Sequence, residues 1–294
     1  MAARLFCRVI DVLVVGGVFR EILAFDLSPV ERLGGSGLTA ATAARHVGAT
    51  VTLASAVGAT EVTEVRELLQ RSDIEERLIV TAGSSGTFAY PAAVSASQPW
   101  PLYRPAEGQP VERPELPLAR VVLLFGIPDF DPVATGWVDD VSEGATVLWD
   151  RQGWLSRART DEHVLALRAT SRIYLANESE AAMDLGADPE WALAQQPPPG
   201  YVAALIKRGT DGVLVFHQGH RYPESVPAYV VNARTTVGSG DAFAGVVAAV
   251  LAAGGELGEG VRTGCAVVAA MLERGQNLVD EDVVRQAWRL RDEA

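Results

Sequence analysis

Short apolar runs alternate with amphipathic stretches along most of the chain. The runs that we predict to be strands cover residues 9–15, 51–57, 121–125, 146–149, 172–176, 202–206 and 213–216. The first is rich in β-branched residues and is closed by Gly16 and Gly17, as expected of a short buried strand. Apolar residues continue through these runs without regular alternation, which is typical of strands that are buried on both faces of a parallel sheet.

Helical patterns lie between several of these runs and dominate the last third of the chain. We predict helices over residues 38–47, 61–71, 161–169, 178–185, 241–253, 258–274 and 280–291. Strands that alternate with helices favour an α/β fold with a mostly parallel sheet and helices on its faces. We expect residues 1–294 to form a single domain.

Two segments do not fit this alternation. They cover residues 19–33 and the proline-rich stretch near 87–117, and each follows a run that we predict to be a strand. Connections of this length are usually functional lids or small β-elements. We therefore expect lid segments at both places.

Composition and charge exclude several classes of protein. Of the 294 residues, 48% are hydrophobic and 21% are charged, which is ordinary for a globular protein. The net charge of −12 has the wrong sign for a broad nucleic-acid or anionic membrane surface. The longest uncharged apolar run, 242–255, is shorter than the roughly 20 residues of a membrane-spanning helix. Cys7 and Cys265 lack metal-ligand spacing, so we expect reduced thiols and a cytoplasmic protein.

Candidate chemistry is concentrated in the segment TTVGSGDAFAG, residues 235–245. Backbone N–H groups of Gly238, Ser239 and Gly240 can converge on an anion, and the helix that follows adds the positive end of its dipole. Asp241 places a carboxylate beside this anion cradle, where it can accept a proton from an attacking hydroxyl. An ordinary helix start, with Asp241 chosen for capping, explains the same residues.

Three further motifs carry glycine or polar residues at definite spacings. The stretch GGSG, residues 34–37, opens a small-residue helix that ends in RHVG, residues 45–48. Asn177-Glu178-Ser179-Glu180 follows one predicted strand, and KRGTDG, residues 207–212, joins two others. A capping box explains the second motif and a tight turn explains the third.

The four motifs together resemble the signatures of the ribokinase-like (PfkB-type) carbohydrate kinases, in the same order. Thr236, Gly238, Gly240, Asp241 and Phe243 match the signature D-T-x-G-A-G-D-x-F-x-x-G, with Ser239 in place of alanine. The resemblance implies a three-layer α/β/α fold with a small β lid. It also implies an ATP-dependent kinase that transfers the γ-phosphoryl group to an alcohol of a sugar or sugar-like molecule.

The resemblance also implies roles for individual residues. Asp241 would be the general base, and the N–H groups of Gly238, Ser239 and Gly240 would stabilise the transferred phosphoryl group. Asn177 and Glu180 would hold Mg²⁺ through water. The nucleotide would contact residues of two later segments: Lys207, Gly209, Gly212, Gly264, Cys265 and Val268. Core packing is a competing explanation for Cys265.

The acceptor pocket departs from the family pattern. Glu21 stands where most members have an aspartate, and Thr39 replaces a customary asparagine. The implied acceptor residues are Glu21, Gly34, Gly35, Thr39 and Asp150. The segment Asp150-Arg151-Gln152-Gly153 resembles the corresponding segment of an inositol-kinase-like branch of the family.

Other functions compete with a sugar kinase. The alternatives are a nucleoside or cyclitol kinase of the same fold and, less favoured, a non-catalytic binding protein. A dinucleotide-binding oxidoreductase is excluded, because the residues after Gly16 and Gly17 lack the G-x-G-x-x-G spacing. We expect a small-molecule acceptor and ATP as partners, with a homodimer through the lid as one possibility.

Dependence on K⁺ is doubtful. In many relatives the residue that opens the C-terminal signature is an aspartate in a cation-binding loop, whereas this chain has Thr235 preceded by Arg234. A neutral hydroxyl beside a guanidinium is a poor ligand set for a monovalent cation. We predict turnover with little or no dependence on K⁺.

Overall fold

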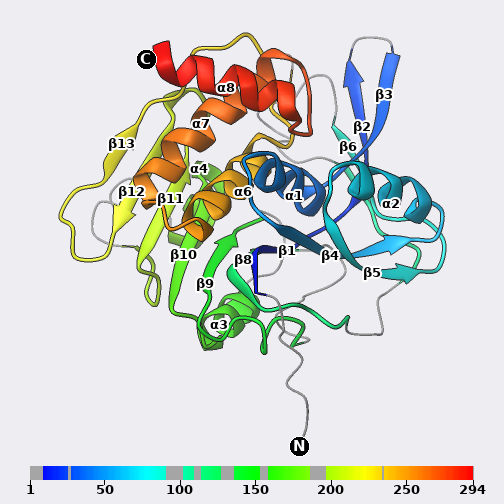
Figure 1. The fold of residues 1–294 in the computed structure, drawn as a ribbon, viewed down its shortest axis with the longest axis horizontal. Helices are drawn as coiled ribbons and strands as arrows, with labels where there is room; N and C mark the ends of the chain where they lie inside the picture. Colours follow the sequence, from blue (N-terminus) through cyan, green and yellow to red (C-terminus); the bar gives the residue numbers. More distant parts are fainter. Residues whose placement is uncertain are drawn as a thin grey trace, which may run out of the picture.

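The computed structural model describes residues 9–25, 28–90, 102–108, 114–126, 136–152, 158–185, 197–233 and 235–293. Cys7, Gly153 and Arg234, which the sequence analysis names, lie outside these ranges. Within them the strands form two sheets, one of nine strands in the order β13-β12-β11-β10-β9-β8-β1-β4-β5 and one of four in the order β3-β2-β6-β7. Figure 1 shows the small sheet at one end of the large one.

The large sheet is parallel except at one edge. Its strands are β1 (Ile10–Val15), β4 (Val51–Gly58), β5 (Glu75–Thr81), β8 (Ala119–Phe125), β9 (Thr146–Asp150), β10 (Ser171–Asn177), β11 (Ala203–Lys207), β12 (Val213–His217) and β13 (Glu224–Val226). β12 and β13 are antiparallel to their neighbours. The small sheet consists of β2 (Phe19–Phe25), β3 (Ser28–Gly34), β6 (Thr87–Tyr90) and β7 (Leu102–Arg104).

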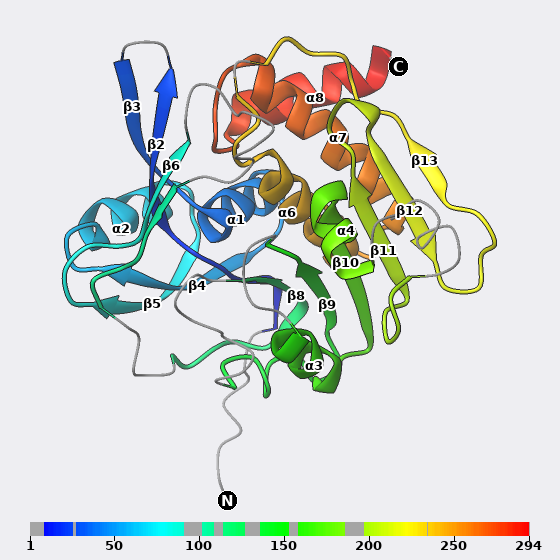
Figure 2. The same cartoon turned by 180° about the vertical axis from the view of Figure 1, so that it is seen from behind.

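Helices cover both faces of the large sheet. One face packs against α1 (Ser36–His46), α2 (Val62–Arg71), α6 (Ser239–Ala252) and α7 (Leu257–Glu273), with α8 (Glu281–Glu293) outside α7. The other face packs against α3 (Ala158–Ala166) and α4 (Glu178–Leu185), which are in front in Figure 2. These three layers confirm the fold class that the sequence predicts.

The apolar runs are continuous because each central strand is buried on both sides. In β1, Val12 and Val14 belong to the core beneath α1 and α6, whereas Leu13 and Val15 belong to the core on the opposite face. All four side chains are fully buried. A strand with only one buried face would instead alternate between apolar and polar residues.

The two segments that break the alternation form the small sheet. Residues 19–33 fold into the β2–β3 hairpin, and β6 and β7 lie at the start and in the middle of the stretch 87–117. Two strands, β5 and β13, are absent from the predicted set. β5 is an edge strand with half-exposed and charged positions, and β13 has three residues, so neither shows the continuous apolar run of a buried strand.

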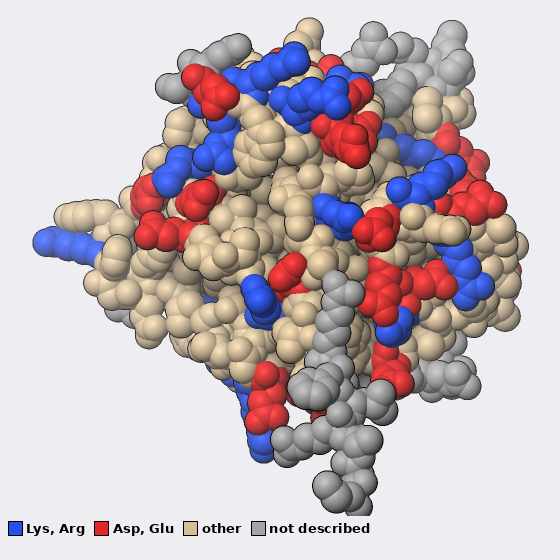
Figure 3. Space-filling view, in the orientation of Figure 1, with Lys and Arg blue, Asp and Glu red and all other residues tan. Residues whose placement is uncertain are grey.

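Charges of both signs are mixed over the face that Figure 3 shows. Lys and Arg lie there beside Asp and Glu, without a broad cationic area on this face. Among the described residues, no helix is both long and apolar enough to cross a membrane.

Candidate active site

Polar residues end three neighbouring parallel strands of the large sheet. β9 ends at Asp150, β10 at Asn177 and β11 at Lys207, and Asn177 lies directly opposite Lys207. Ligands in open α/β sheets bind at the carboxyl ends of the strands, near the point where the strand order reverses. Here the order reverses at β1, which lies between β8 and β4.

The anion cradle lies at the N-terminus of α6. Gly238 has a φ of +84°, a left-handed conformation that favours glycine, and it caps the helix. The N–H of Ser239 donates to the carbonyl of Thr236 at 3.1 Å, so this donor is used within the loop. The N–H groups of Gly240 and Asp241 are at the open end of the helix, where the backbone offers no intrahelical acceptor. Of the predicted donors, the N–H of Ser239 is therefore used by the loop, whereas the N–H of Gly240 stays available together with that of Asp241.

Asp241 lies in the first turn of α6, and its pKa is strongly raised. Burial, and after it the negative charge of Asp150, raise the pKa of Asp241 to about 7, against the opposing charge of Lys207. Gln152 Nε2 donates a hydrogen bond to Asp241 Oδ1 at 3.3 Å. A half-buried carboxylate with this pKa can exchange a proton near neutral pH.

Lys207 and Asp150 form a buried ion pair beside the cradle. Lys207 Nζ lies 2.9 Å from Asp150 Oδ1 and 2.7 Å from Oδ2. Burial alone would lower the pKa of Lys207, but the charges of Asp150 and Glu180 hold it above its ordinary value. A Cβ atom built on Gly240 would lie 3.1 Å from Lys207 Nζ, so the ammonium group lies directly against the backbone of the cradle.

Asn177 and Glu180 form a reciprocal capping box at the start of α4. The N–H of Asn177 donates to Glu180 Oε2 at 2.7 Å, and the N–H of Glu180 donates to Asn177 Oδ1 at 2.8 Å. The capping explanation is therefore correct for these residues. The Glu180 charge also acts on Asp150 and Lys207, which places it at the same edge of the sheet.

The donor set at this edge is compatible with Mg²⁺. A carboxylate and an amide oxygen are ligand types that Mg²⁺ takes, together with several waters. No group of three or more His, Cys, Asp or Glu able to hold a metal occurs within the described ranges, and a largely hydrated Mg²⁺ does not need one.

Glu21 connects the small sheet to the start of α1. Its carboxylate accepts one hydrogen bond from the N–H of Gly35 and one from Arg32 Nε, each at 3.0 Å, and the residue is only 3% exposed. A Cβ atom on Gly34 would lie 2.3 Å from the Glu21 carboxyl carbon, and Gly35 has a φ of +99°. The structure therefore brings Glu21, Gly34 and Gly35 together.

Thr39 extends this group toward the cradle. It is fully buried, and its hydroxyl has no hydrogen-bond partner among the described residues. Its Oγ1 lies 3.6 Å from where a Cβ on Gly238 would be. Asp150, which the resemblance places with the acceptor residues, accepts hydrogen bonds from Lys207, and its contact with an acceptor stays a prediction.

Three polar residues of the site are absent from the predicted set. Gln152 contacts Asp241, Arg32 contacts Glu21, and Tyr90 lies close enough for Glu21 and Asp241 to affect its acidity. Burial is the larger cause of the raised pKa of Tyr90, followed by those two negative charges. Pairing of the β2–β3 hairpin would have placed Arg32 opposite Glu21, but nothing in the local sequence indicates the position of Tyr90.

Most of the glycine and apolar residues predicted to contact the nucleotide have packing roles. Gly212 has a φ of +85°, and a Cβ there would meet the carbonyl of Val226 at 2.0 Å. A Cβ on Gly264 would lie 2.7 Å from the ring of Phe243, and Cys265 is buried with its pKa raised by burial to about 11. Val268 packs against the same core, whereas a Cβ on Gly209 would meet open space. Contact of these residues with a nucleotide stays a prediction.

Comparisons with known proteins agree with this geometry. Residues 146–279 match the model of the pfkB family carbohydrate kinases. Ribokinase from Cryptococcus neoformans var. grubii serotype A, solved in complex with ADP, is 18% identical with a TM-score of 0.76, covering 97% of this chain and 99% of that one. Phosphofructokinase-2 from Escherichia coli, in complex with substrates and products, is 16% identical with a TM-score of 0.68, covering 96% and 99%.

A third structure has the same extent of similarity. An Escherichia coli protein assigned as ribokinase II, in complex with ATP and Mg²⁺, is 17% identical with a TM-score of 0.74, covering 97% and 99% of the two chains. No curated protein sequence matches the chain. At these identities the structures establish a ribokinase-like fold, and the matched segment contains Asp150, Asn177, Lys207 and Asp241. The matched segment is similar to the pfkB family carbohydrate kinases, and the chain as a whole has the ribokinase-like fold.

Proposed function

We propose that the protein is an ATP-dependent kinase that transfers the γ-phosphoryl group of ATP to an alcohol of a sugar or sugar-like small molecule. The observation that carries this proposal is the position of Asp241, a carboxylate with a pKa of about 7 at the open N-terminus of α6. One helix turn thus presents both a base and donors for an anion. Phosphoryl transfer needs this combination, because it depends on positioning and on stabilisation of negative charge.

Asp241 is the general base in this proposal. Its carboxylate accepts the proton of the acceptor hydroxyl as that oxygen attacks the phosphoryl group, and a pKa near the working pH suits such a transfer. The hydrogen bond from Gln152 Nε2 orients the carboxylate.

Negative charge on the transferred group is stabilised by the helix start and by Lys207. The N–H groups of Gly240 and Asp241 point out of the helix end, and the dipole of α6 favours an anion there. Lys207 Nζ contributes a full positive charge against Gly240, and Asp150 holds it in place. A buried ammonium acts more strongly than an exposed one because water screens it less.

ATP and Mg²⁺ are the co-substrate and the cofactor of the proposed reaction. They accompany the structurally similar Escherichia coli protein, and ADP accompanies the Cryptococcus ribokinase. We assign Asn177 and Glu180 to Mg²⁺ through water, and Lys207, Gly209 and Gly212 to the phosphates and ribose. Bound Mg²⁺ would neutralise charge on the nucleotide phosphates. The adenine would lie near Gly264, Cys265 and Val268.

The acceptor is assigned to the space between the small sheet and α1. Glu21 supplies a buried carboxylate there, Thr39 supplies an unpartnered hydroxyl, and Arg32 has a buried Nη2 without a described partner. Such groups suit a molecule with several hydroxyls, which can donate to the carboxylate and accept from the guanidinium. In this proposal the small sheet is the lid. Dimerisation through it and a cytoplasmic location stay predictions.

The test is release of ADP by the purified protein in the presence of Mg²⁺ and a panel of sugars, sugar phosphates, cyclitols and nucleosides. Asp241→Asn is the diagnostic variant, and Asp292→Asn, at an exposed position near the end of α8, is its matched control. We expect one acceptor class to stimulate ADP release, and Asp241→Asn to lower turnover by about 10² or more. Activity of Asp241→Asn within a few-fold of the native chain would remove this residue from the mechanism.

A further inference from the structure

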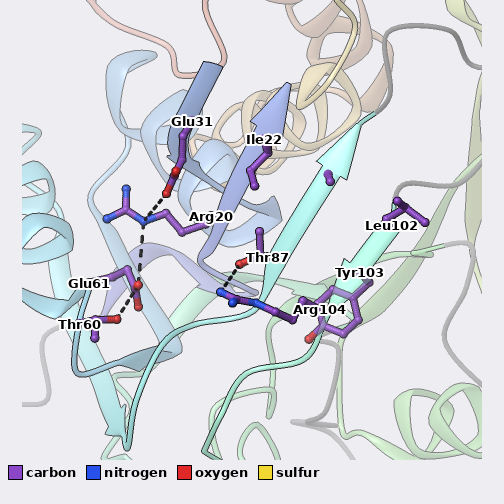
Figure 4. Close-up of a pocket in the computed structure, with 10 residues that line it drawn as sticks. Arg20, Ile22, Glu31, Thr60, Glu61, Thr87, Leu102, Tyr103 and Arg104 are labelled. Carbon is purple, nitrogen blue, oxygen red and sulfur yellow. Dashed lines mark hydrogen bonds and ion pairs between the residues drawn. The ribbon is translucent and has the colours of Figure 1, made fainter. Parts of the chain in front are cut away.

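A second cavity, of about 650 Å³, lies on the face of the small sheet that points away from Glu21. Its floor is formed by β2, β3, β6 and β7, and Thr60 and Glu61 before α2 form one wall. We call it the outer pocket. Figure 4 shows its side chains, with Arg20 and Glu61 on one side and Leu102 and Arg104 on the other.

The register of the small sheet arranges the floor of the outer pocket in two rows. Arg20 is opposite Thr87, and Thr87 is opposite Arg104, which makes one polar row across three strands. The next row in the same direction contains Ile22, Ala89 and Leu102. Residues directly opposite one another share a face of the sheet, so a cationic row lies beside an apolar one.

The two arginines of the polar row differ in their partners. Arg20 has three carboxylates around it, with Glu64 at 2.6 Å, Glu31 at 3.8 Å and Glu61 at 4.0 Å. Arg104 has only the neutral hydroxyl of Thr87, which accepts from its Nη2 at 3.1 Å, and no acidic partner among the described residues. A guanidinium has five N–H donors, and its fork matches one carboxylate in a bidentate arrangement.

The apolar row is exposed beside this cation. Leu102 is 59% exposed, and Ile22 and Ala89 complete an apolar strip along the cavity. At the far end, Glu31 is exposed and only loosely paired with Arg20, so that end repels a second negative group. The outer pocket therefore combines an apolar strip, an acidic end and a cation that has no acidic partner among the described residues.

We propose that the outer pocket binds a small organic monocarboxylate. The carboxylate is held by Arg104, with the hydroxyl of Thr87 beside it, and the apolar part of the ligand covers Leu102 and Ile22. A dianion such as a phosphate monoester fits less well, because the carboxylates of Glu31 and Glu61 face the other end of the cavity. The site is separate from the cradle at Gly240.

Binding in the outer pocket is expected to change acceptor affinity, a consequence that rests on the proposed function. Successive residues of a strand point to opposite faces, so Arg20 in the outer pocket is followed by Glu21 on the acceptor side. Glu31 is likewise followed by Arg32, and Glu21 and Arg32 form an ion pair at 3.0 Å. A ligand that tightens the outer face of β2 and β3 must act on the residues that line the acceptor.

The experiment titrates the full chain with hexanoate by calorimetry, with 1-hexanol and inorganic phosphate as comparison probes. We expect hexanoate to bind at least ten-fold more tightly than either, because only hexanoate has both a single negative charge and an apolar tail. Arg104→Gln should lose at least ten-fold in hexanoate affinity, as expected for a charged hydrogen bond. The matched control is Arg285→Gln. In the native chain Arg285 is an exposed residue of α8 that pairs with Asp282.

Equal binding of hexanoate by Arg104→Gln and the native chain would overturn the site, as would equal binding of hexanoate and 1-hexanol. A second measurement determines the KM of the acceptor with and without saturating hexanoate. A change in KM in the native chain but not in Arg104→Gln supports the coupling, and an unchanged KM overturns it. Calorimetry needs no turnover, so failure of the proposed kinase activity and failure of this site are read separately.

Discussion

Three charged side chains, all provided by the large sheet and α6, set the chemistry of the site. Asp150, Lys207 and Asp241 lie so close that each affects the acidity of another. Lys207 pairs with Asp150, and Asp241 has no ion-pair partner among the described residues. Burial, and after it the charge of Asp150, raise the pKa of Asp241 to about 7. Burial also raises the pKa of Asp150, to about 6, and buried groups with perturbed pKa values are typical of acid–base sites.

Glu21 has two roles that one substitution can separate. Its carboxylate holds the N–H of Gly35, and in our proposal it also accepts hydrogen bonds from the acceptor. Glu21→Gln keeps an oxygen for Gly35 but loses the charge. We expect the KM of the acceptor to rise about ten-fold, the usual effect of losing a charged hydrogen bond, with the KM of ATP unchanged.

The matched control for this prediction is Glu67→Gln, at an exposed position of α2. Thermal unfolding of both variants shows whether the Gly35 turn has kept its stability. If Glu21→Gln raised the KM of ATP and left that of the acceptor unchanged, Glu21 would not belong to the acceptor pocket.

At the scale of elements, the close approach of α1 and α6 brings the two glycine motifs together. A Cβ atom on Gly245 would lie 2.2 Å from the carbonyl oxygen of Ala40, and one on Gly37 would lie 2.6 Å from the carbonyl oxygen of Gly16. These glycines therefore allow backbones to touch, a role separate from phosphate binding. They position the start of α6 against Thr39 and the first strand.

Gly245→Ala is expected to destabilise the fold by about 1–3 kcal/mol, because the backbone of Ala40 must move to admit the methyl group. Gly260→Ala in α7 is the matched control, since its Cβ would lie at an ordinary 3.4 Å from Val247. Alanine also stabilises a helix interior relative to glycine, so the control should be as stable as the native chain or more stable. Denaturant unfolding measures both, and equal stability of the two variants would contradict the close contact.

At the scale of the whole molecule, the carboxyl edge of the large sheet gathers groups that are costly to bury. Folding disfavours the ionised form of Asp241 relative to its protonated form, since the pKa of this residue rises from an ordinary 3.8 to about 7. Between these values the folded chain binds more protons at this residue than the unfolded chain. The contribution of Asp241 to stability therefore falls as pH rises from about 4 to 7, and stays at its lowest above 7.

Activity and stability should consequently change in opposite directions with pH. We expect kcat/KM to rise with pH through about 7 as Asp241 loses its proton, because only the deprotonated base can accept one. In thermal unfolding, Asp241→Asn should exceed the native chain in Tm at pH 8, and the difference should shrink as pH is lowered toward 4. A Tm difference that is independent of pH would show that Asp241 is not buried at a cost.

Little or no dependence of turnover on K⁺ stays a prediction for the active-site edge of the sheet. The hydroxyl of Thr235 accepts a hydrogen bond from the N–H of Val237 at 3.2 Å, so it already shapes the loop before the cradle. This bond favours a structural role for Thr235.

The sequence by itself determined the features that depend on local chemistry or on burial of a single element. β1, β4 and β8 to β12 appear as apolar runs because each of these strands is covered on both faces, and the helices show their own period. The cradle is visible because a left-handed turn before a helix needs Gly238, whatever the rest of the chain does. The capping box of Asn177 and Glu180 is local in the same way.

Only the tertiary structure decided which distant side chains meet. Asp150 pairs with Lys207, 57 positions away, because β10 lies between their strands in a parallel order that no local pattern specifies. Tyr90 lies close enough to Glu21 and Asp241 for their charges to raise its pKa. Arg104 lies in the same row as Arg20 because of the register of the short strands of the small sheet. Register and strand order are set by the packing of the whole core, so contacts that depend on them cannot be read from any single stretch of residues.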